Sequence, residues 1–275
     1  MTFKSILVFT DRGTSAKARL ALARTLAENF DAHIVGLAVR PTQIYPMGFV
    51  EMIPQDVINS ISAQNEEVVA ALRKSFEAAM VASGLSAKSE WREAIGDPAQ
   101  QIAVHGRYSD LIVIGQPDPD VQSGLATELA DDVVLQAGRP ILVIPYTQRE
   151  TSIGKRIMVA WNGSREAARA VTDAMPLLKR ATSVDVVAAN PDGIGDEPGA
   201  DIGKFLARHG VTVEVSHTLT DDISIGDELL NRTADRNIDM LVMGAYGHSR
   251  FRETILGGAT RHILRHMTVP TFLSH

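Results

Sequence analysis

Residues 239–247 read Asp-Met-Leu-Val-Met-Gly-Ala-Tyr-Gly, and after nine more residues the chain continues Gly257-Gly258-Ala259-Thr260. An apolar run without polar alternation predicts a strand that is buried on both faces. Glycines at its end allow the backbone to turn sharply, and the free N–H groups at the start of a helix attract anions. The stretch therefore predicts a buried strand that leads to a phosphate site at the N-terminus of a helix.

An altered copy of this stretch stands in the first half of the chain. Residues 110–115 read Asp-Leu-Ile-Val-Ile-Gly, but residues 116–120 read Gln-Pro-Asp-Pro-Asp, and Thr127 and Glu128 occupy the later glycine positions. Prolines lack an N–H donor, and aspartates repel phosphate. We therefore expect the first copy to be degenerate and nucleotide binding to be confined to the second copy.

The duplication extends over the whole chain. Residues 4–11, KSILVFTD, are similar to residues 155–162, KRIMVAWN, and each copy closes with a proline before a short apolar run. Apolar runs alternate with helical stretches in both copies, which predicts α/β domains with doubly wound parallel sheets. We expect two tandem, five-stranded, Rossmann-like domains, 1–148 and 153–275, joined by a short polar linker.

Ten strands are expected, five in each domain. They are predicted near residues 5–10, 33–39, 89–93, 110–115 and 141–145, and near residues 156–161, 183–189, 212–218, 239–244 and 271–274. The first domain also has an insertion at residues 41–64 with many apolar residues. It is interpreted as a cover over its own domain, with a lid or a contact surface as the alternative.

Composition narrows the classes of function. The net charge of −6 and the pI of about 5.8 give no reason to expect nucleic acid as a partner. The chain has no cysteine, which excludes disulfides, thiolate catalysis and cysteine-ligated metal sites. Its beginning does not resemble a signal peptide, and no apolar run approaches the roughly 20 residues that span a bilayer. We expect a cytoplasmic protein with no membrane partner.

The strand ends carry the candidate ligand contacts. Ligands of open α/β sheets bind beyond the carboxyl ends of the strands. In the second domain, the first strand ends at residues 160–163, and the fourth ends at residues 243–247. Trp161 is compatible with stacking on a base or with filling space in the core.

The spacing Gly244-x2-Gly247-x9-Gly257-Gly258 resembles the nucleotide-binding motif of universal stress proteins, G-x2-G-x9-G-[ST]. The resemblance also includes the opening strand and turn and the final proline-led strand of both copies. It covers nearly the whole chain, as a tandem two-domain member. It implies that the protein takes part in the stress response as a sensor or regulator, and that the two domains pair through their last strands.

The resemblance also implies an adenine nucleotide as the ligand, ATP or else AMP or ADP, with or without Mg²⁺. The residues carried over by position are Ala160, Asn162, Ala188, Met243, Gly244, Gly247, His248, Gly257, Gly258, Ala259 and Thr260. Asn162 replaces the usual aspartate and Gly258 replaces the serine or threonine. The loss of such hydrogen bonds weakens affinity by about tenfold or more. A further homodimer and an unidentified protein partner remain open.

Two functions are considered as alternatives to a nucleotide-binding regulator. One is a slow ATP hydrolase, in which His248 and Arg250 would assist, although no convincing base is evident. The other is a structural or partner-binding protein whose glycines serve only tight turns and close packing. We therefore predict no enzyme and no catalytic residue.

Some polar residues are interpreted as structural. His262 and His266 have the i, i+4 spacing of a zinc pair but lack a third ligand, so no metal site is predicted. Ser164 and Thr14 are expected to cap helices, as is Ser224 or Asp222. The Asp221-Asp222 pair is interpreted as part of a solvated loop.

Overall fold

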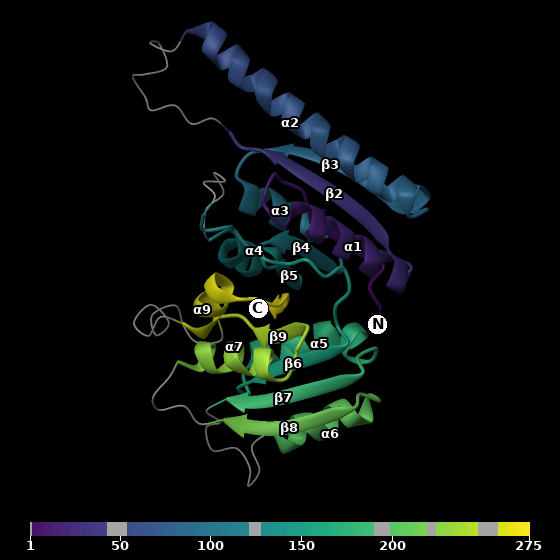
Figure 1. Ribbon diagram of the computed structural model, residues 1–275, viewed down its shortest axis with the longest axis vertical. Helices are drawn as coiled ribbons and strands as arrows, with labels where there is room; N and C mark the ends of the chain where they lie inside the picture. The colour runs from purple at the N-terminus through teal and green to yellow at the C-terminus, as the bar shows by residue number, and fades with distance from the viewer. Residues whose placement is uncertain (1, 43–53, 121–127, 190–198, 219–223, 247–257) are drawn as a thin grey trace.

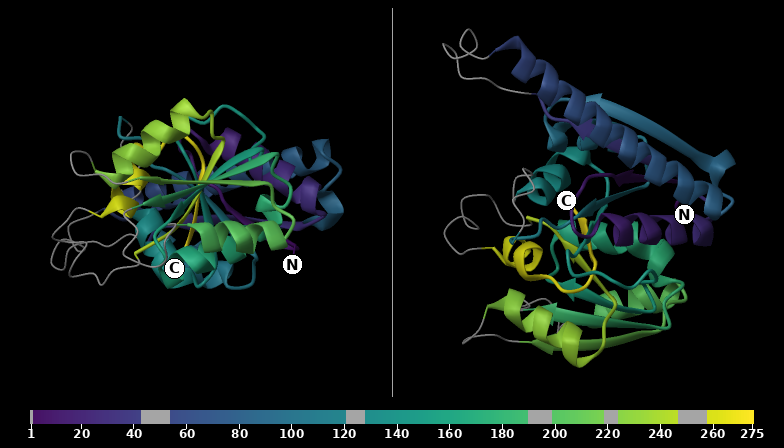
Figure 2. Two further views of the ribbon diagram at one scale, coloured as in Figure 1. Left: turned by 90° about the horizontal axis from the view of Figure 1, so that it is seen from below. Right: turned by 45° about the horizontal axis from the view of Figure 1, so that its top comes forward.

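The protein forms a single twisted sheet of ten strands with helices on both faces (Figures 1 and 2). The computed structural model describes residues 2–42, 54–120, 128–189, 199–218, 224–246 and 258–275. The strand order is β3-β2-β1-β4-β5-β10-β9-β6-β7-β8, so the two copies occupy opposite ends of the sheet.

The first half of the molecule contains β1 to β5. Its elements are β1 (Ser5–Phe9), α1 (Ala16–Phe30), β2 (His33–Arg40), α2 (Gln55–Ala82), the short helix η2 (Ser86–Lys88), β3 (Ser89–Ile95), α3 (Pro98–Gly106), β4 (Leu111–Gly115), α4 (Leu129–Ala137) and β5 (Ile141–Ile144). The second half contains β6 to β10. Its elements are β6 (Arg156–Trp161), α5 (Arg165–Leu178), β7 (Ser183–Ala189), α6 (Ala200–Arg208), β8 (Val213–Thr218), α7 (Ile225–Asp235), β9 (Met240–Gly244), α9 (Ala259–His266) and β10 (Thr271–Ser274).

The predicted fold class is confirmed. Each half has the same strand order, with its third, second, first, fourth and fifth strands side by side, and all pairs within a half are parallel. The halves meet at β5 and β10, which pair antiparallel with Thr271 opposite Val143. The expected pairing through the last strands is therefore present within one chain. We call this β5–β10 junction the seam.

Two apolar clusters lie on opposite faces of the sheet. Helices α1, α2, α5 and α6 pack on one face, and α3, α4, α7 and α9 pack on the other. The central strands are buried on both sides, as their continuous apolar sequences predict. Strands β3 and β8 form the two outer edges of the sheet.

Matching aspartates fasten the start of each half. The Asp110 carboxylate accepts hydrogen bonds from the backbone N–H groups of Lys4 and Ser5, at 2.7 and 3.0 Å. Asp239 accepts three such bonds from residues 154–156, at 2.9–3.1 Å. Because each carboxylate ties the fourth strand to the first, the repeated aspartate has a structural reason.

Helix α2 occupies part of the insertion of the first half. It is 28 residues long, but its buried residues are Val69, Phe76 and Met80, all in its second half. That part of α2 packs on β2, where the ring of Phe76 lies against Gly36. The apolar residues that suggested a cover, at positions 44–53, lie outside the described residues.

Candidate functional site

The carboxyl ends of β6 and β9 lie side by side in the second half. Ala160 is paired in register with Met243, and both side chains face the α7 and α9 side of the sheet. Met243 is only 6% exposed. The structure therefore brings these two predicted residues together at the edge where ligands of such sheets bind.

Helix α9 begins beside this edge. Gly258 is its N-cap residue, followed by Ala259 and Thr260 in the first turn. Tyr246, two residues after β9, has a positive φ of 56°, and its N–H donates to Thr260 Oγ1 at 3.4 Å. Thr260 is buried, and its oxygen accepts this bond. The two ends of the predicted motif therefore meet.

Gly244 has a packing reason to be glycine. A Cβ atom at this position would lie 2.5 Å from the backbone nitrogen of Ala167 and 2.6 Å from the carbonyl carbon of Glu166. Both atoms belong to the first turn of α5, which cannot move aside as a side chain can. The close approach of α5 to β9 therefore accounts for Gly244 whether or not a ligand binds.

Asn162 stands exposed at the carboxyl end of β6. Its Oδ1 accepts a hydrogen bond from the N–H of Ser164 at 3.1 Å. Ser164 in turn caps α5 by accepting from the N–H of Ala167, which confirms its predicted role. Trp161, just before Asn162, packs against the apolar cluster under α5 and α6, which favours the space-filling interpretation.

Ala188 lies apart from the other predicted residues. It is paired in register with Trp161, so its side chain points to the α5 and α6 face, opposite to Ala160 and Met243. It is fully buried, 3.4 Å from the position of a Cβ at Gly199. The structure does not bring the Ala188 side chain together with those of Ala160 and Met243.

Three predicted contacts, Gly247, His248 and Gly257, lie outside the described residues. The same holds for Arg250 and for the Asp221-Asp222 pair. Ser224, the alternative to Asp222 as a cap, does accept from the N–H of Asp227 at the start of α7.

The matching positions of the first half are filled by side chains. Asp11 Oδ1 accepts from Arg19 Nη2 at 2.8 Å and from the N–H of Gly13 at 2.7 Å. Arg19 is 2% exposed, and its guanidinium lies against Gly115, where a Cβ would be 2.0 Å from Nη1. This ion pair, in which Arg19 is buried and Asp11 is partly exposed, therefore covers the end of β4.

The prediction that Thr14 caps a helix is wrong. Helix α1 begins at Ala16, and its N-cap is Ser15, whose side chain makes no capping bond. Thr14 Oγ1 instead donates to Asp118 Oδ2 at 2.7 Å. The hydroxyl is drawn to a carboxylate 104 residues further along the chain.

Gln116 directly follows β4 and reaches across the seam. Its Nε2 donates to the carbonyl oxygens of Leu264 and Arg265 in α9, at 2.9 and 3.0 Å. Its Oε1 accepts from the N–H of Tyr146 at 3.2 Å. The sequence analysis treated Gln116 only as part of the degenerate motif. A buried polar residue that directly follows an apolar strand was the signal available.

Asp131 is a buried carboxylate in the first turn of α4. It is 7% exposed, and its Oδ1 has no hydrogen-bond partner among the described residues. Burial raises the pKa of Asp131 to about 6, against the opposing effect of Arg261 on α9. This carboxylate of α4, which feels the charge of Arg261 on α9, therefore gains or loses its proton at about pH 6.

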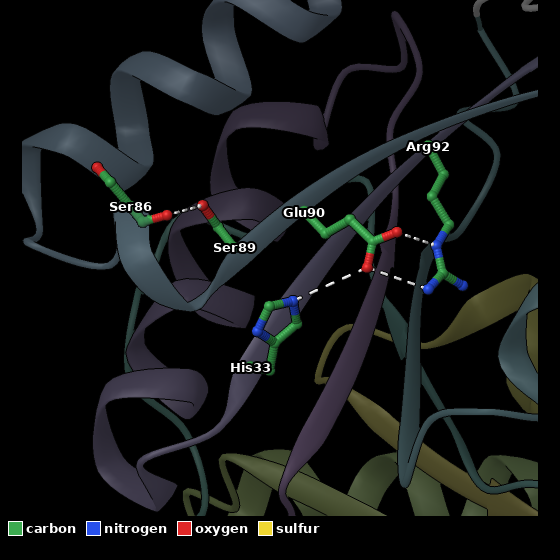
Figure 3. Close-up of polar contacts among 5 residues, drawn as sticks. All are labelled: His33, Ser86, Ser89, Glu90 and Arg92. Carbon is green, nitrogen blue, oxygen red and sulfur yellow. Dashed lines mark hydrogen bonds and ion pairs between the residues drawn. The ribbon is translucent and has the colours of Figure 1, made fainter.

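A polar cluster lies on the outer edge of the first half (Figure 3). Glu90 accepts from Arg92 Nε and Nη2 at 2.7 and 3.1 Å, and its Oε2 lies 4.0 Å from His33 Nε2. The bond from Arg92 holds the pKa of Glu90 below its usual value. These groups are partly exposed and salt-bridged to one another, so we assign them to the solvated edge of β3.

His262 is bonded to α7. Its Nε2 lies 2.8 Å from Asp227 Oδ1, and the centre of its ring lies 4.6 Å from that of His266, with the two rings tilted by 44°. Among the residues that the structure describes, no three histidine or acidic side chains gather as a metal site would require. Nor does any helix in these ranges have the length and apolar character needed to cross a membrane.

A cavity of about 230 Å³ lies in the first half, between β1, α1 and α2. Its polar lining is supplied by Thr10, Asp11, Lys17, Arg24 and Ser75, and Leu20 and Leu72 are among its apolar residues. It opens on the α1 and α2 face and includes none of the residues predicted to bind nucleotide.

The fold and the strand-end site place the chain among doubly wound α/β proteins, whose ligands bind beyond the carboxyl ends of parallel strands. Residues 2–145 and 154–275 each match the family model described as the universal stress protein family. The chain therefore belongs to the universal stress protein family and contains two copies of its domain.

One curated relative and two solved structures are similar to the chain. The chain is 24% identical over 175 residues to the universal stress protein Slr1230 of Synechocystis, covering 58% of this chain and 56% of the relative. It thus spans little more than half of that relative. A universal stress protein from Archaeoglobus fulgidus superposes with a TM-score of 0.74 at 19% identity, covering 98% of this chain and 95% of that chain. A functionally unknown protein from Pseudomonas aeruginosa gives 0.60 at 13% identity, over 99% and 92% of the two chains.

Proposed function

We propose that this protein binds an adenine nucleotide in its second half and acts as a stress-response regulator rather than as an enzyme. The observation that carries the proposal is the meeting of Tyr246 with Thr260. It supports a site in which the start of α9 faces the carboxyl ends of β6 and β9.

The proposed phosphate contacts are backbone groups. Thr260 is buried and its oxygen accepts from Tyr246, and Gly258 has no side chain. The N–H groups of the first helical turn have no partner within the helix and carry the positive end of its dipole. A phosphate at this position would therefore be held mainly by the α9 amides, while Ala160 and Met243 would form the apolar floor beneath the base.

The first test is direct binding. ATP, ADP and AMP are titrated into the purified protein with and without Mg²⁺, and nucleotide released on denaturation is identified by mass spectrometry. We expect binding of at least one of the three, and no phosphate release from ATP above the rate without protein. Protein that releases no nucleotide and shows no thermal shift with any of them contradicts the proposal.

Substitutions of Gly258 test the position of the phosphate. Aspartate, asparagine and serine all favour a helix N-cap and all make the same demand on the backbone at this position, so any effect of the substitution on folding is matched among the three variants. Gly258→Asp should lower affinity by about tenfold or more because its charge repels phosphate, whereas Gly258→Asn should lower it far less. Gly258→Ser restores the hydroxyl of the family motif and should raise affinity. Equal losses for aspartate and asparagine would place the phosphate elsewhere.

A further inference from the structure

Helix α9 is a short element held from both ends. It has eight residues, about 12 Å of helix, and helices this short are marginal without tertiary anchors. At its start, the Thr260 side chain is bonded to Tyr246. In its middle, His262 is bonded to Asp227 of α7.

The C-terminus of α9 lacks a left-handed capping residue, although the N–H of Met267 donates to the carbonyl oxygen of Ile263 at 2.7 Å. Helix α4, the matching helix of the first half, ends at Gly138, whose φ of 62° is the left-handed conformation that closes many helices. Helix α9 is followed by Met267 in an extended conformation, with φ of −60° and ψ of 136°. Since the carbonyls of a last turn have no following helical N–H, those of Leu264 and Arg265 need another donor.

Gln116 supplies that donor from the other half of the molecule. It is 6% exposed, and both polar groups of its side chain are bonded, the NH₂ to α9 and the carbonyl oxygen to Tyr146. Its backbone N–H donates to Ile144 at the end of β5, at 2.7 Å. The side-chain amide of Gln116 is therefore bonded to the first half through Tyr146 and to the second half through α9.

We propose that Gln116 is a positioning residue for the nucleotide site, through which the first half controls affinity at the start of α9. This inference rests on the proposed function, because it assigns a regulation to that same site. The first half would then contribute to binding without contacting the nucleotide. By reciprocity, nucleotide at the start of α9 would tighten the contact across the seam.

The test compares three full-length variants. Gln116→Met keeps a side chain of similar length but removes the donor, and Gln116→Glu sets a carboxylate against the two carbonyls. Gln136→Met is the matched control, since Gln136 is exposed on α4. Amide hydrogen exchange over residues 259–267 is measured without nucleotide, and ATP, ADP and AMP affinity is measured by titration. Circular dichroism and exchange in β1 and β2 show whether each variant is folded.

We expect Gln116→Met to speed exchange in α9 and to weaken nucleotide binding by about threefold to tenfold. Gln116→Glu should do both more strongly, and Gln136→Met should do neither. Wild-type protein that binds no nucleotide would contradict the proposed function. The exchange measurement would then decide by itself whether Gln116 anchors α9. Unchanged exchange in α9, or unchanged affinity in a Gln116→Met variant of a binding wild type, would overturn this inference alone.

Discussion

The ends of β4 and β9 show how one sequence motif acquired two structures. Both strands end in glycine, at Gly115 and Gly244. Each glycine is in close contact with a residue of a helix that packs on the sheet. At Gly115 the neighbour is the guanidinium of Arg19, whereas at Gly244 it is the backbone of α5. The end of β4 is covered by the ion pair of Asp11 and Arg19, whereas Asn162, which matches Asp11 in the second half, is exposed at the end of β6, the strand beside β9. An identical glycine is thus no sign of an identical site.

The largest difference in stability is expected between substitutions of the matching residues Asp11 and Asn162. Asp11→Ala leaves the guanidinium of Arg19 buried without its carboxylate, which should destabilise the protein by about 3 kcal/mol. Asn162→Ala removes one exposed hydrogen bond and should cost less than about 1 kcal/mol. Urea unfolding followed by circular dichroism measures both. Equal losses would mean that the two strand ends are energetically alike.

Alanine at the two glycines separates the two kinds of close contact. Gly244→Ala drives a Cβ into the α5 backbone and should cost about 2 to 3 kcal/mol. Gly115→Ala meets the end of a longer side chain that has some freedom to shift, so its cost should be smaller, about 1 to 2 kcal/mol. The same unfolding measurement applies, and a larger loss at Gly115 would reverse the interpretation.

Asp131, which lies beside the seam, is predicted to make the stability of the protein depend on pH. Because burial raises its folded pKa to about 6, the folded state binds the proton more tightly than the unfolded chain, and stability falls as pH rises from about 4 to 6. Arg261 and Arg265 reduce this penalty, while Glu128 and Asp132 add to it. Asp131→Asn should therefore stabilise the protein by about 1 to 2 kcal/mol at pH 8 and hardly at all at pH 4. Thermal unfolding at both pH values tests this, and a stabilisation that is independent of pH would contradict it.

The smallest contrast is between the caps of α1 and α5. Ser164 accepts from the N–H of Ala167, so Ser164→Ala should cost about 1 kcal/mol. Ser15 makes no such bond, and Ser15→Ala should cost less. Thermal denaturation midpoints of the two variants give the comparison, in which a larger shift for Ser15 would show that the caps have been misassigned.

The strands could be predicted because their signal is local. The predicted bounds of all ten strands agree with the structure within about one residue, except that β3 extends to Ile95, two residues beyond its expected end. What could not be predicted depends on distant partners. Thr14 is drawn from its expected capping role by Asp118, and Gln116 finds its acceptors 148 and 149 residues away.

The candidate site was predictable only in part for the same reason. Ala160 and Met243 meet because the ends of the first and fourth strands are neighbours in this topology. Ala188 faces the other side because it is level with Trp161, a register that the apolar pattern does not specify. The predicted role of Asn162 as a ligand contact, like those of Gly258 and Ala259, stays a prediction.

The antiparallel seam has a consequence for symmetry. At the seam the two halves run in opposite directions, so the carboxyl ends of β5 and β10 lie at opposite edges of the sheet there. Two identical domains joined in this way would be related by a twofold rotation, and any mutation would alter both edges at once. Duplication within one chain removes that constraint. One edge can evolve as a fixed support while the other remains free to change.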